Sequence, residues 1–363
     1  MPSAGSRVEQ YAELLVARSL DVQPGWQVMV VATPHARPLV EEVVRGIARR
    51  GAYPLVRLAF NDREQVPLEA VWAAEAPEEL LPTLAPIEVH TREQLDAWLL
   101  VFSAGNIYDG SELASERRLA LQHAYRPFNY RKAAGEVPWV ACPVPTEALA
   151  QEAGLTLRGY EDVLYDACLR DWDAERDRMK RYVDGFDAAD EVRIVAPGTD
   201  LTLSIAGRMS DIDDGHLNMP GGEFFLSPLE DSAEGTIEFS EFAATWIGRR
   251  CEGIRLRFEA GRVVDASARS NEEFLLRFLE TDDGASRLGE LGIGCNRGIP
   301  RYIRHMWFDE KVDGTVHLAL GAGFPHIGGT NESSVHWDLV KDLSRGRIEL
   351  DGRTVQEKGV WLP

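Results

Sequence analysis

Apolar residues in the first 150 positions alternate between helical spacing and short continuous runs. Helical spacing occurs over residues 7–20 and again after Pro38, which stands where a first helical turn tolerates proline. Continuous apolar runs predict strands at residues 28–32, 55–60, 98–102 and 139–144, with a further helical stretch near residues 112–123. Because a strand, a helix and a strand within about 30 residues form the βαβ unit of a parallel sheet, we predict an open parallel α/β domain over residues 1–150.

A different pattern begins at residue 191. Short runs with alternating apolar positions are separated by glycine, and they predict strands in VRIVAPGTDLTLSIAGR, GTIEFS, GIRLRFEAGRVVDASA, GTVHLALG and RIELDGRTV. One helix is predicted over residues 271–280. The predicted fold class is therefore α/β, with the N-terminal open parallel domain followed by a β-rich α+β domain over residues 191–363. A charged helical connection over residues 151–190 joins the two.

Charge and motif content argue against several classes of function. The formal net charge of -20 repels phosphate backbones and anionic lipid headgroups, so neither nucleic acid nor a membrane is an expected partner. TPHARP follows the first predicted strand, where a dinucleotide-binding fold would carry GxGxxG. The chain shows neither a secretory signal nor a run of about 18 apolar residues, and its 4 widely spaced cysteines read as reduced thiols. We therefore expect a cytoplasmic protein.

Five residues of the second predicted domain are candidate metal ligands. They stand beside glycine or inside short predicted strands, and they are Glu223 in NMPGGEFF, Glu290 in RLGELGIG, His317 in GTVHLALG, and His336 and Asp338 in SSVHWDLV. Glycine lets a backbone approach an ion closely, and strands hold side chains precisely. If SSVHWDLV is extended, His336 and Asp338 project from one face and can reach one ion, while Trp337 points into the opposite layer.

The charges of these five candidates favour two divalent metal ions. Three carboxylates and two neutral imidazoles carry -3 against +4 from two ions, and a bridging hydroxide would complete neutrality. Nitrogen and oxygen ligands without sulfur suit zinc, cobalt or manganese, and the ligand types do not distinguish among these metals. Two ions about 3.5 to 4 Å apart activate water and stabilise a developing oxyanion, which suits amide hydrolysis.

Other polar residues receive structural interpretations. Taken alone, His317 would more often be a hydrogen-bonded core histidine than a ligand, and only the joint pattern favours the metal site. The acidic group Asp211, Asp213 and Asp214 lacks the spacing of a calcium-binding loop and is predicted to form a solvated loop. Asn331 is predicted to form a turn that positions the strand of His336.

The motifs PGTDLTLSIAGR, NMPGGEFFLSP, LGELGIG, FDEKVDGTVHLALG and NESSVHWDLV follow one another along the chain, after YAELLVARSLDVQPGWQVMVVA near its start. In this order they resemble the thermophilic aminopeptidase T and S family of dinuclear metallopeptidases. The resemblance implies a two-domain homodimer that removes N-terminal residues from peptides with a free amino terminus. It also implies that Glu223 and His317 hold the first metal ion, that His336 and Asp338 hold the second, and that Glu290 bridges both and shuttles a proton.

One position departs from the family pattern. The family places a tyrosine seven residues after the histidine of its HLALG-like motif, and this chain has Phe324 there. That tyrosine is thought to steady the tetrahedral intermediate, and losing one such donor typically costs about 100- to 1,000-fold in turnover. His326, two residues along, is a candidate replacement donor. The departure leaves a weak activity or a different reaction open.

Two alternative functions are also consistent with the candidate ligands. A ring-opening dioxygenase of a dihydroxylated pyridine is similar in fold and uses one ferrous ion held by two histidines and an aspartate, a set that this chain also offers. The presence of both Glu223 and Glu290 favours the two-metal hydrolase instead. The other alternative is a metal-binding protein without catalysis, although carboxylate-rich sites more readily keep positions open for water or substrate.

Overall fold

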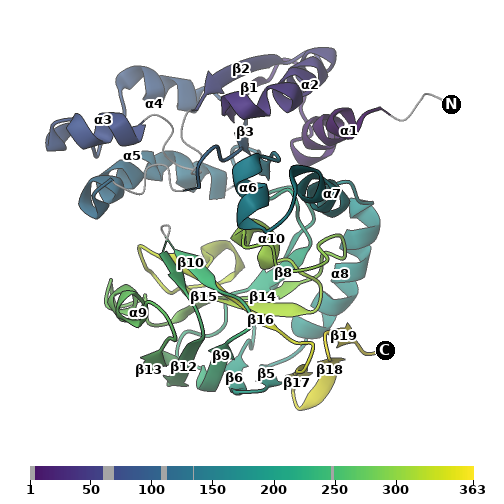
Figure 1. Ribbon diagram of the computed structural model, residues 1–363, viewed down its shortest axis with the longest axis vertical. Coiled ribbons are helices and arrows are strands. Elements are labelled where there is room, and N and C mark those ends of the chain that lie inside the picture. The colour runs from purple at the N-terminus through teal and green to yellow at the C-terminus, as the bar shows by residue number, and fades with distance from the viewer. Residues whose placement is uncertain (1–4, 60–68, 108–112, 134, 247–248) are drawn as a thin grey trace. The chain divides into compact units, whose positions relative to one another are not determined.

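The computed structural model describes residues 5–59, 69–107, 113–133, 135–246 and 249–363 (Figure 1). The chain divides into two compact units. The first unit comprises Met1–Leu169 and Gly215–Pro220, and the second comprises Arg170–Asp214 and Gly221–Pro363.

A parallel sheet with the strand order β2-β1-β3-β4 forms the centre of the first unit. Its strands are β1 (Gln27–Ala32), β2 (Tyr53–Leu58), β3 (Ala97–Phe102) and β4 (Trp139–Pro143). Its helices are α1 (Arg7–Glu13), continued by a π-helical segment (Leu14–Ser19), α2 (Arg37–Arg49), α3 (Glu69–Glu75), α4 (Pro86–Glu93), α5 (Ser115–Ala133), α6 (Glu147–Glu152) and α7 (Leu157–Cys168), with 3-10 turns at Pro34–Ala36 and Glu78–Leu80. The predicted open parallel α/β arrangement is confirmed. Phe60 and Glu112, at the ends of two predicted elements, lie outside the described residues.

The burial pattern explains why these segments fold as a parallel layer. Nearly every residue of β1 and β3 is buried, as in strands that are covered on both faces. Helix α2 buries Leu39, Val43 and Ile47, which recur at helical spacing along one side. The apolar runs and helical periodicity in the sequence therefore correspond to the two kinds of buried surface in this unit.

Two antiparallel sheets form most of the second unit. The larger has the order β13-β12-β9-β6-β5-β17-β18-β19, the smaller has the order β16-β15-β14-β8-β7, and β10 pairs with β11. The strands are β5 (Glu191–Ala196), β6 (Thr199–Ser204), β7 (Asp211–Asp213), β8 (Glu223–Leu226), β9 (Glu234–Phe239), β10 (Ala244–Trp246), β11 (Arg249–Cys251), β12 (Ile254–Glu259), β13 (Arg262–Ser267), β14 (Leu288–Gly294), β15 (Thr315–Gly321), β16 (His336–Asp342), β17 (Arg347–Leu350), β18 (Arg353–Glu357) and β19 (Val360–Trp361). The helices are α8 (Trp172–Phe186), α9 (Glu272–Leu279) and α10 (Met306–Asp309), with a 3-10 turn at Pro325–Ile327.

One apolar cluster contains side chains from both large sheets of this unit. Ile194 and Leu256 come from the eight-stranded sheet, Leu291 and Leu318 come from the five-stranded sheet, and Phe186 of α8 joins them. Burying one such side chain contributes about 1.5–3 kcal/mol relative to leaving it exposed. The predicted β-rich α+β character of this part of the chain is confirmed, and the five-stranded sheet uses only one face for the core.

The four cysteines of the chain are dispersed and buried. Cys142, Cys168, Cys251 and Cys295 all lie in described segments, and each is a buried thiol outside any disulfide. Among the described helices, none combines the length and the apolar character that crossing a membrane requires.

Candidate metal centre

The candidate site lies on the face of the five-stranded sheet that is turned away from the apolar core. Successive strand residues point to opposite faces, so Leu318 enters the core whereas His317 points to the other side. In β16, Trp337 is buried in the core cluster, and His336 and Asp338 share the opposite face. The predicted geometry of the SSVHWDLV segment is therefore confirmed.

A β-bulge in β14 brings Glu290 to this face. Leu288 and Glu290 pair with two adjacent residues of β15, Leu320 and Ala319, so Gly289 is the additional residue. An uninterrupted alternation would place Leu288 and Glu290 on the same, core-facing side. Bulges commonly occur beside active sites, where they redirect a side chain, and here the bulge separates a core leucine from a site carboxylate.

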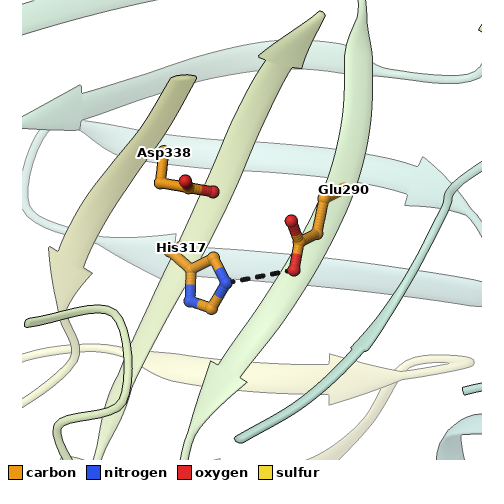
Figure 2. A group of neighbouring side chains, drawn as sticks. All are labelled: Glu290, His317 and Asp338. Carbon is orange, nitrogen blue, oxygen red and sulfur yellow. Dashed lines mark hydrogen bonds and ion pairs between the residues drawn. The ribbon is translucent and has the colours of Figure 1, made fainter. Parts of the chain in front are cut away.

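The five residues predicted from the sequence lie together in one cluster. Glu290 is central, because its Oε1 lies 3.3 Å from His317 Nε2 and its Oε2 lies 3.0 Å from His336 Nε2. Glu223 Oε2 lies 3.6 Å from His317 Nε2, and Asp338 Oδ1 lies 3.5 Å from His336 Nε2. Figure 2 shows Glu290, His317 and Asp338 facing one another from neighbouring strands, and their ligand atoms all lie within 4.8 Å of one another.

Both imidazoles are oriented by backbone carbonyls. His317 Nδ1 lies 3.1 Å from the carbonyl oxygen of Glu310, and His336 Nδ1 lies 2.8 Å from that of Ala322. A carbonyl oxygen only accepts, so each Nδ1–H donates, and in the neutral ring each Nε2 carries a lone pair. Each Nε2 is directed toward carboxylate oxygens, to which it donates when the ring is protonated, and histidine ligands of metal ions are typically oriented in this way.

Three of the five candidate ligands are largely removed from water, whereas His336 and Asp338 are half-buried. Glu223, Glu290 and His317 are at most 5% exposed. Within the described part of the chain, the buried Oε2 atom of Glu223 has no hydrogen-bond partner. Because an unpaired buried carboxylate oxygen is costly, this atom and the donor set around it fit a divalent cation.

The two imidazoles of the cluster lie in a strongly negative field, and they in turn stabilise the charged form of Glu290. Burial raises the pKa of Glu290, but hydrogen bonds from His317 and His336 outweigh burial and lower it to about 2. Burial lowers the pKa of His317, whereas its contacts with Glu290 raise it, and the net result is about 10. For His336, burial is outweighed by the charge of Asp338, which raises the pKa well above its ordinary value. A field of this sign favours binding of cations.

Two further charged residues belong to the cluster, and sequence reasoning missed both. Lys311 Nζ lies 3.0 Å from Glu223 Oε1 and contacts the Glu310 carboxylate. Burial raises the pKa of Glu310 to about 8. The charge of Lys311 opposes this shift, whereas the charges of Glu223 and Asp338 add to it. Both residues stand in the FDEKVDGTVHLALG motif, where a lysine between acidic residues directly before a candidate ligand was the available signal.

The acidic group preceding β8 corrects one prediction. Asp213 and Asp214 are buried, at 2% and 1% exposure, so they do not form the predicted solvated loop. Asp214 Oδ2 pairs with Arg176 at 2.8 Å, and Asp213 Oδ2 lies 4.0 Å from Lys311 Nζ. These cations explain how the two carboxylates are accommodated inside the fold.

The surroundings of Phe324 show what replaces the family tyrosine. Its ring centroid lies 5.3 Å from that of His336 and 5.0 Å from that of Phe225. The His326 ring lies 5.9 Å from Phe324, and its Nε2 faces Asp211 Oδ2 at 3.1 Å. The position next to His336 is therefore occupied by an apolar ring, and one nitrogen of the candidate replacement donor is directed to an aspartate.

The segment leading into β16 is held by side-chain hydrogen bonds. Asn331 Nδ2 donates to the carbonyls of Gly284 and Gly321, so it positions the segment before His336, as predicted, but by joining segments distant in sequence rather than by forming the predicted turn. Asp282 accepts from the Ser333 hydroxyl at 2.8 Å and from the Ser334 backbone at 2.7 Å. These contacts anchor the chain directly before His336.

Gly292 makes room for the ring of His317. The two residues are paired across β14 and β15, and a Cβ atom at position 292 would overlap the imidazole. We expect Gly292→Ala to displace His317 and to lower metal affinity by about 10- to 100-fold, the cost that altered support of a ligand typically carries. Equilibrium dialysis with Mn²⁺ measures this change.

A glycine outside the site provides the control for this substitution. A Cβ at Gly185 of α8 would meet only Leu350 Cδ1, at 3.7 Å, which is an ordinary contact. Gly185→Ala is expected to keep the metal affinity of the native protein. Unchanged affinity in Gly292→Ala would show that His317 is not held in the site by this close approach.

A family model described as thermophilic metalloprotease (M29) matches residues 5–361. The chain belongs to the M29 family. The resemblance that the sequence motifs indicate is thereby confirmed, and the five candidate ligands all fall inside the matched region.

Over nearly its whole length the chain is also similar to named aminopeptidases. Aminopeptidase 2 of Geobacillus stearothermophilus is 28% identical over 408 residues, covering 97% of this chain and 95% of that protein. Aminopeptidase T of Thermus thermophilus is 26% identical and covers 98% of this chain and 96% of that protein. The solved structure of wild-type AmpT from Thermus thermophilus matches with a TM-score of 0.82 and 26% identity, over 98% of this chain and 99% of that one.

A second solved structure shares the fold with this M29 protein. It is the 2,5-dihydroxypyridine dioxygenase of Pseudomonas putida KT2440, which matches with a TM-score of 0.58 and 15% identity. The match covers 99% of this chain and 98% of that one. At this level of identity the likeness shows the fold alone.

Proposed function

We propose that this M29 protein is a metal-dependent aminopeptidase that hydrolyses N-terminal residues from peptides at a site for two divalent ions. Glu223, Glu290, His317, His336 and Asp338 are the proposed ligands. The orientation of the two histidines is the observation that carries this proposal: each donates Nδ1–H to a backbone carbonyl and turns Nε2 toward carboxylate oxygens. Two acceptors that face each other need a cation or a proton between them.

The arrangement of the side chains supports two ions rather than one. Glu290 presents Oε1 to His317 and Oε2 to His336, so its two oxygens face two different imidazoles, while Asp338 has a ligand atom within 4.8 Å of those of both Glu290 and His317. Glu223 completes the group of His317, and Asp338 completes the group of His336. Each group contains an imidazole nitrogen and carboxylate oxygens, a set that suits zinc, cobalt or manganese.

Charge neutrality leads to the same number of ions. The carboxylates of Glu310 and Asp213 join those of Glu223, Glu290 and Asp338, and Lys311 is the ammonium group among them. With Glu310 protonated, since its pKa is raised to about 8, the other four carboxylates and the ammonium group leave an excess of three negative charges, which two divalent ions and one hydroxide balance. A buried excess of this size without cations would be strongly unfavourable.

The chemistry of peptide hydrolysis divides between the ions and the protein. When bound, a pair of divalent ions supplies an activated water and polarises the carbonyl of the scissile bond. The resemblance gives Glu290, which lies between the two imidazoles, a second role beside metal binding: it would carry a proton from the attacking water to the leaving amine. The buried carboxylates also favour a substrate with a protonated amino terminus.

Metal removal and reloading test the proposal. Protein stripped with a chelator is expected to lose hydrolysis of aminoacyl chromogenic substrates while it remains folded by circular dichroism. Reloading with zinc, cobalt or manganese is expected to restore hydrolysis as two equivalents bind per chain. A folded, fully loaded protein that cleaves no aminoacyl substrate contradicts the proposed activity, and saturation at one equivalent contradicts the two-ion site.

The same experiment separates the alternative functions. A mononuclear iron dioxygenase would need one ferrous ion, whereas both Glu223 and Glu290 reach His317 in this cluster. If the metal only stabilises the fold, the protein is expected to unfold when the metal is removed and to show no turnover when the metal is bound. The homodimer that the resemblance implies remains a proposal, and its test is the mass of the native protein in solution.

A further inference from the structure

Lys311 is a cation built into the candidate metal centre. Its side chain is 0% exposed. The Nζ atom lies 3.0 Å from Glu223 Oε1 and 4.0 Å from Asp213 Oδ2, and it also contacts Glu310. A fully buried ammonium group is tolerated only where carboxylates surround it.

The backbone fixes the place of this ammonium group. Lys311 follows α10, and its N–H donates to the carbonyl of Phe308 at 3.0 Å. Its own carbonyl accepts from the N–H of Asn296 at 2.8 Å. Both the backbone N–H and the carbonyl of Lys311 are therefore hydrogen-bonded, and its side chain reaches the carboxylates from a defined position.

Lys311 leaves one oxygen of Glu223 for a metal ion. Oε1 is bound by the ammonium group, whereas Oε2 accepts no hydrogen bond from the described residues and lies 3.6 Å from His317 Nε2. Glu223 can therefore offer one oxygen to an ion beside His317. The ammonium group of Lys311 remains bound to the other oxygen of the same carboxylate.

This charge makes the two halves of the site unequal. An ion held by Glu223 and His317 shares a ligand with an ammonium group, and like charges at such separation repel strongly in a buried site. In the other half, the contacts described for His336 and Asp338 are with each other, with Glu290, with Phe324 and with a backbone carbonyl, and Asp338 also has a ligand atom within 4.8 Å of that of His317; none of these groups is an ammonium group. The repulsion therefore acts mainly on one of the two ions.

We infer that Lys311 makes the Glu223–His317 half of the centre the weaker and exchangeable one, so that the enzyme retains one ion and acquires the second according to the metal concentration. The inference rests on the proposed two-ion site. Lys311 is a positioning residue here, because it acts on a ligand rather than on the substrate. Because the second ion binds weakly, the activity is expected to depend on the concentration of free metal ions.

Metal binding by a charge-deleting variant tests the inference. Equilibrium dialysis with Mn²⁺ is expected to resolve two binding steps in the native protein. Lys311→Met removes the ammonium group and keeps the length of the side chain, so the weaker step is expected to tighten by at least about tenfold while the stronger step stays the same. Lys311→Gln is a second variant without the charge, with the same expected result.

A second buried lysine provides the matched control. Lys341 is also 0% exposed, and its Nζ pairs with Glu241 at 2.9 Å, on the core side of β16. Lys341→Met is expected to leave both binding steps unchanged. A weaker step that is unchanged or weakened in Lys311→Met and Lys311→Gln overturns the inference, whereas a native protein that binds fewer than two ions overturns the proposed function.

Histidine variants give a test that does not depend on replacing Lys311. His317→Ala is expected to abolish the weaker step and keep the stronger one, and His336→Ala is expected to abolish the stronger step. The opposite assignment of the two steps overturns the inference even if both lysine variants fail to fold. Binding is measured in every case, so the result does not depend on turnover.

Discussion

Replacing Glu290 by glutamine is expected to reduce kcat/KM for aminoacyl substrates by about 10²- to 10⁴-fold, the usual contribution of a positioned acid–base group. The substitution keeps the shape of the side chain and removes the charge that lies between His317 and His336. Because Glu290 contacts both imidazoles, the number of bound Mn²⁺ ions is also expected to fall below two per chain. Steady-state kinetics and metal analysis on the same preparation measure both effects.

A carboxylate elsewhere in the second unit controls for the loss of a charge. Glu349 of β17 is 12% exposed and pairs with Arg347 at 2.6 Å, outside the site. Glu349→Gln is expected to keep activity and metal content. A Glu290→Gln protein that is fully active with two ions rules out the proposed role, and one that unfolds indicates a structural role for the carboxylate.

Phe324→Tyr is expected to raise kcat by about 100- to 1,000-fold with a smaller change in KM. The reason is that the resemblance places a tyrosine hydroxyl at this position, and one donor to a developing oxyanion is typically worth this factor. The ring of Phe324 already lies 5.3 Å from that of His336, so the added hydroxyl enters the neighbourhood of the proposed ligands. Kinetics on metal-loaded protein measure the gain.

Phe242 provides a control for adding a hydroxyl to a partly buried ring. It stacks on Tyr302 with a centroid distance of 4.7 Å and takes no part in the candidate site. Phe242→Tyr is expected to leave kcat unchanged. If Phe324→Tyr behaves like this control, position 324 has no part in the reaction, and the hydroxyl of the family motif is not what limits this enzyme.

Local periodicity was sufficient to predict much of the fold. The apolar runs of the first unit became β1 to β4, and the alternation in SSVHWDLV placed His336 and Asp338 on one face with Trp337 in the core. Such predictions succeed because a strand side chain has only two directions, and burial selects between them. The clustering of the five candidate ligands followed from motifs rather than from periodicity.

The residues that sequence reasoning missed lie outside regular strands and helices, where the apolar pattern does not indicate which way a side chain points. Glu310 and Lys311 stand between α10 and β15, and the side chain of Lys311 reaches Glu223 only through the tertiary fold. Burial of Asp214 depends on Arg176, which lies 38 residues away in the sequence. The sequence therefore shows that these charges exist, whereas their partners are defined only once distant segments pack together.

The bulge at Gly289 has a consequence for how this enzyme matures. Beyond the bulge, leucine and isoleucine of β14 face the core and alternate with Glu290, Gly292 and Gly294 on the site face. A shift of β14 by one residue along β15 would turn the carboxylate toward the core and the apolar side chains toward the site. A misaligned sheet would then lack a complete set of ligands. Metal ions that bind only the correctly aligned sheet would therefore stabilise this pairing of the strands. The metal-free protein would lack that stabilisation as well as its catalytic activity.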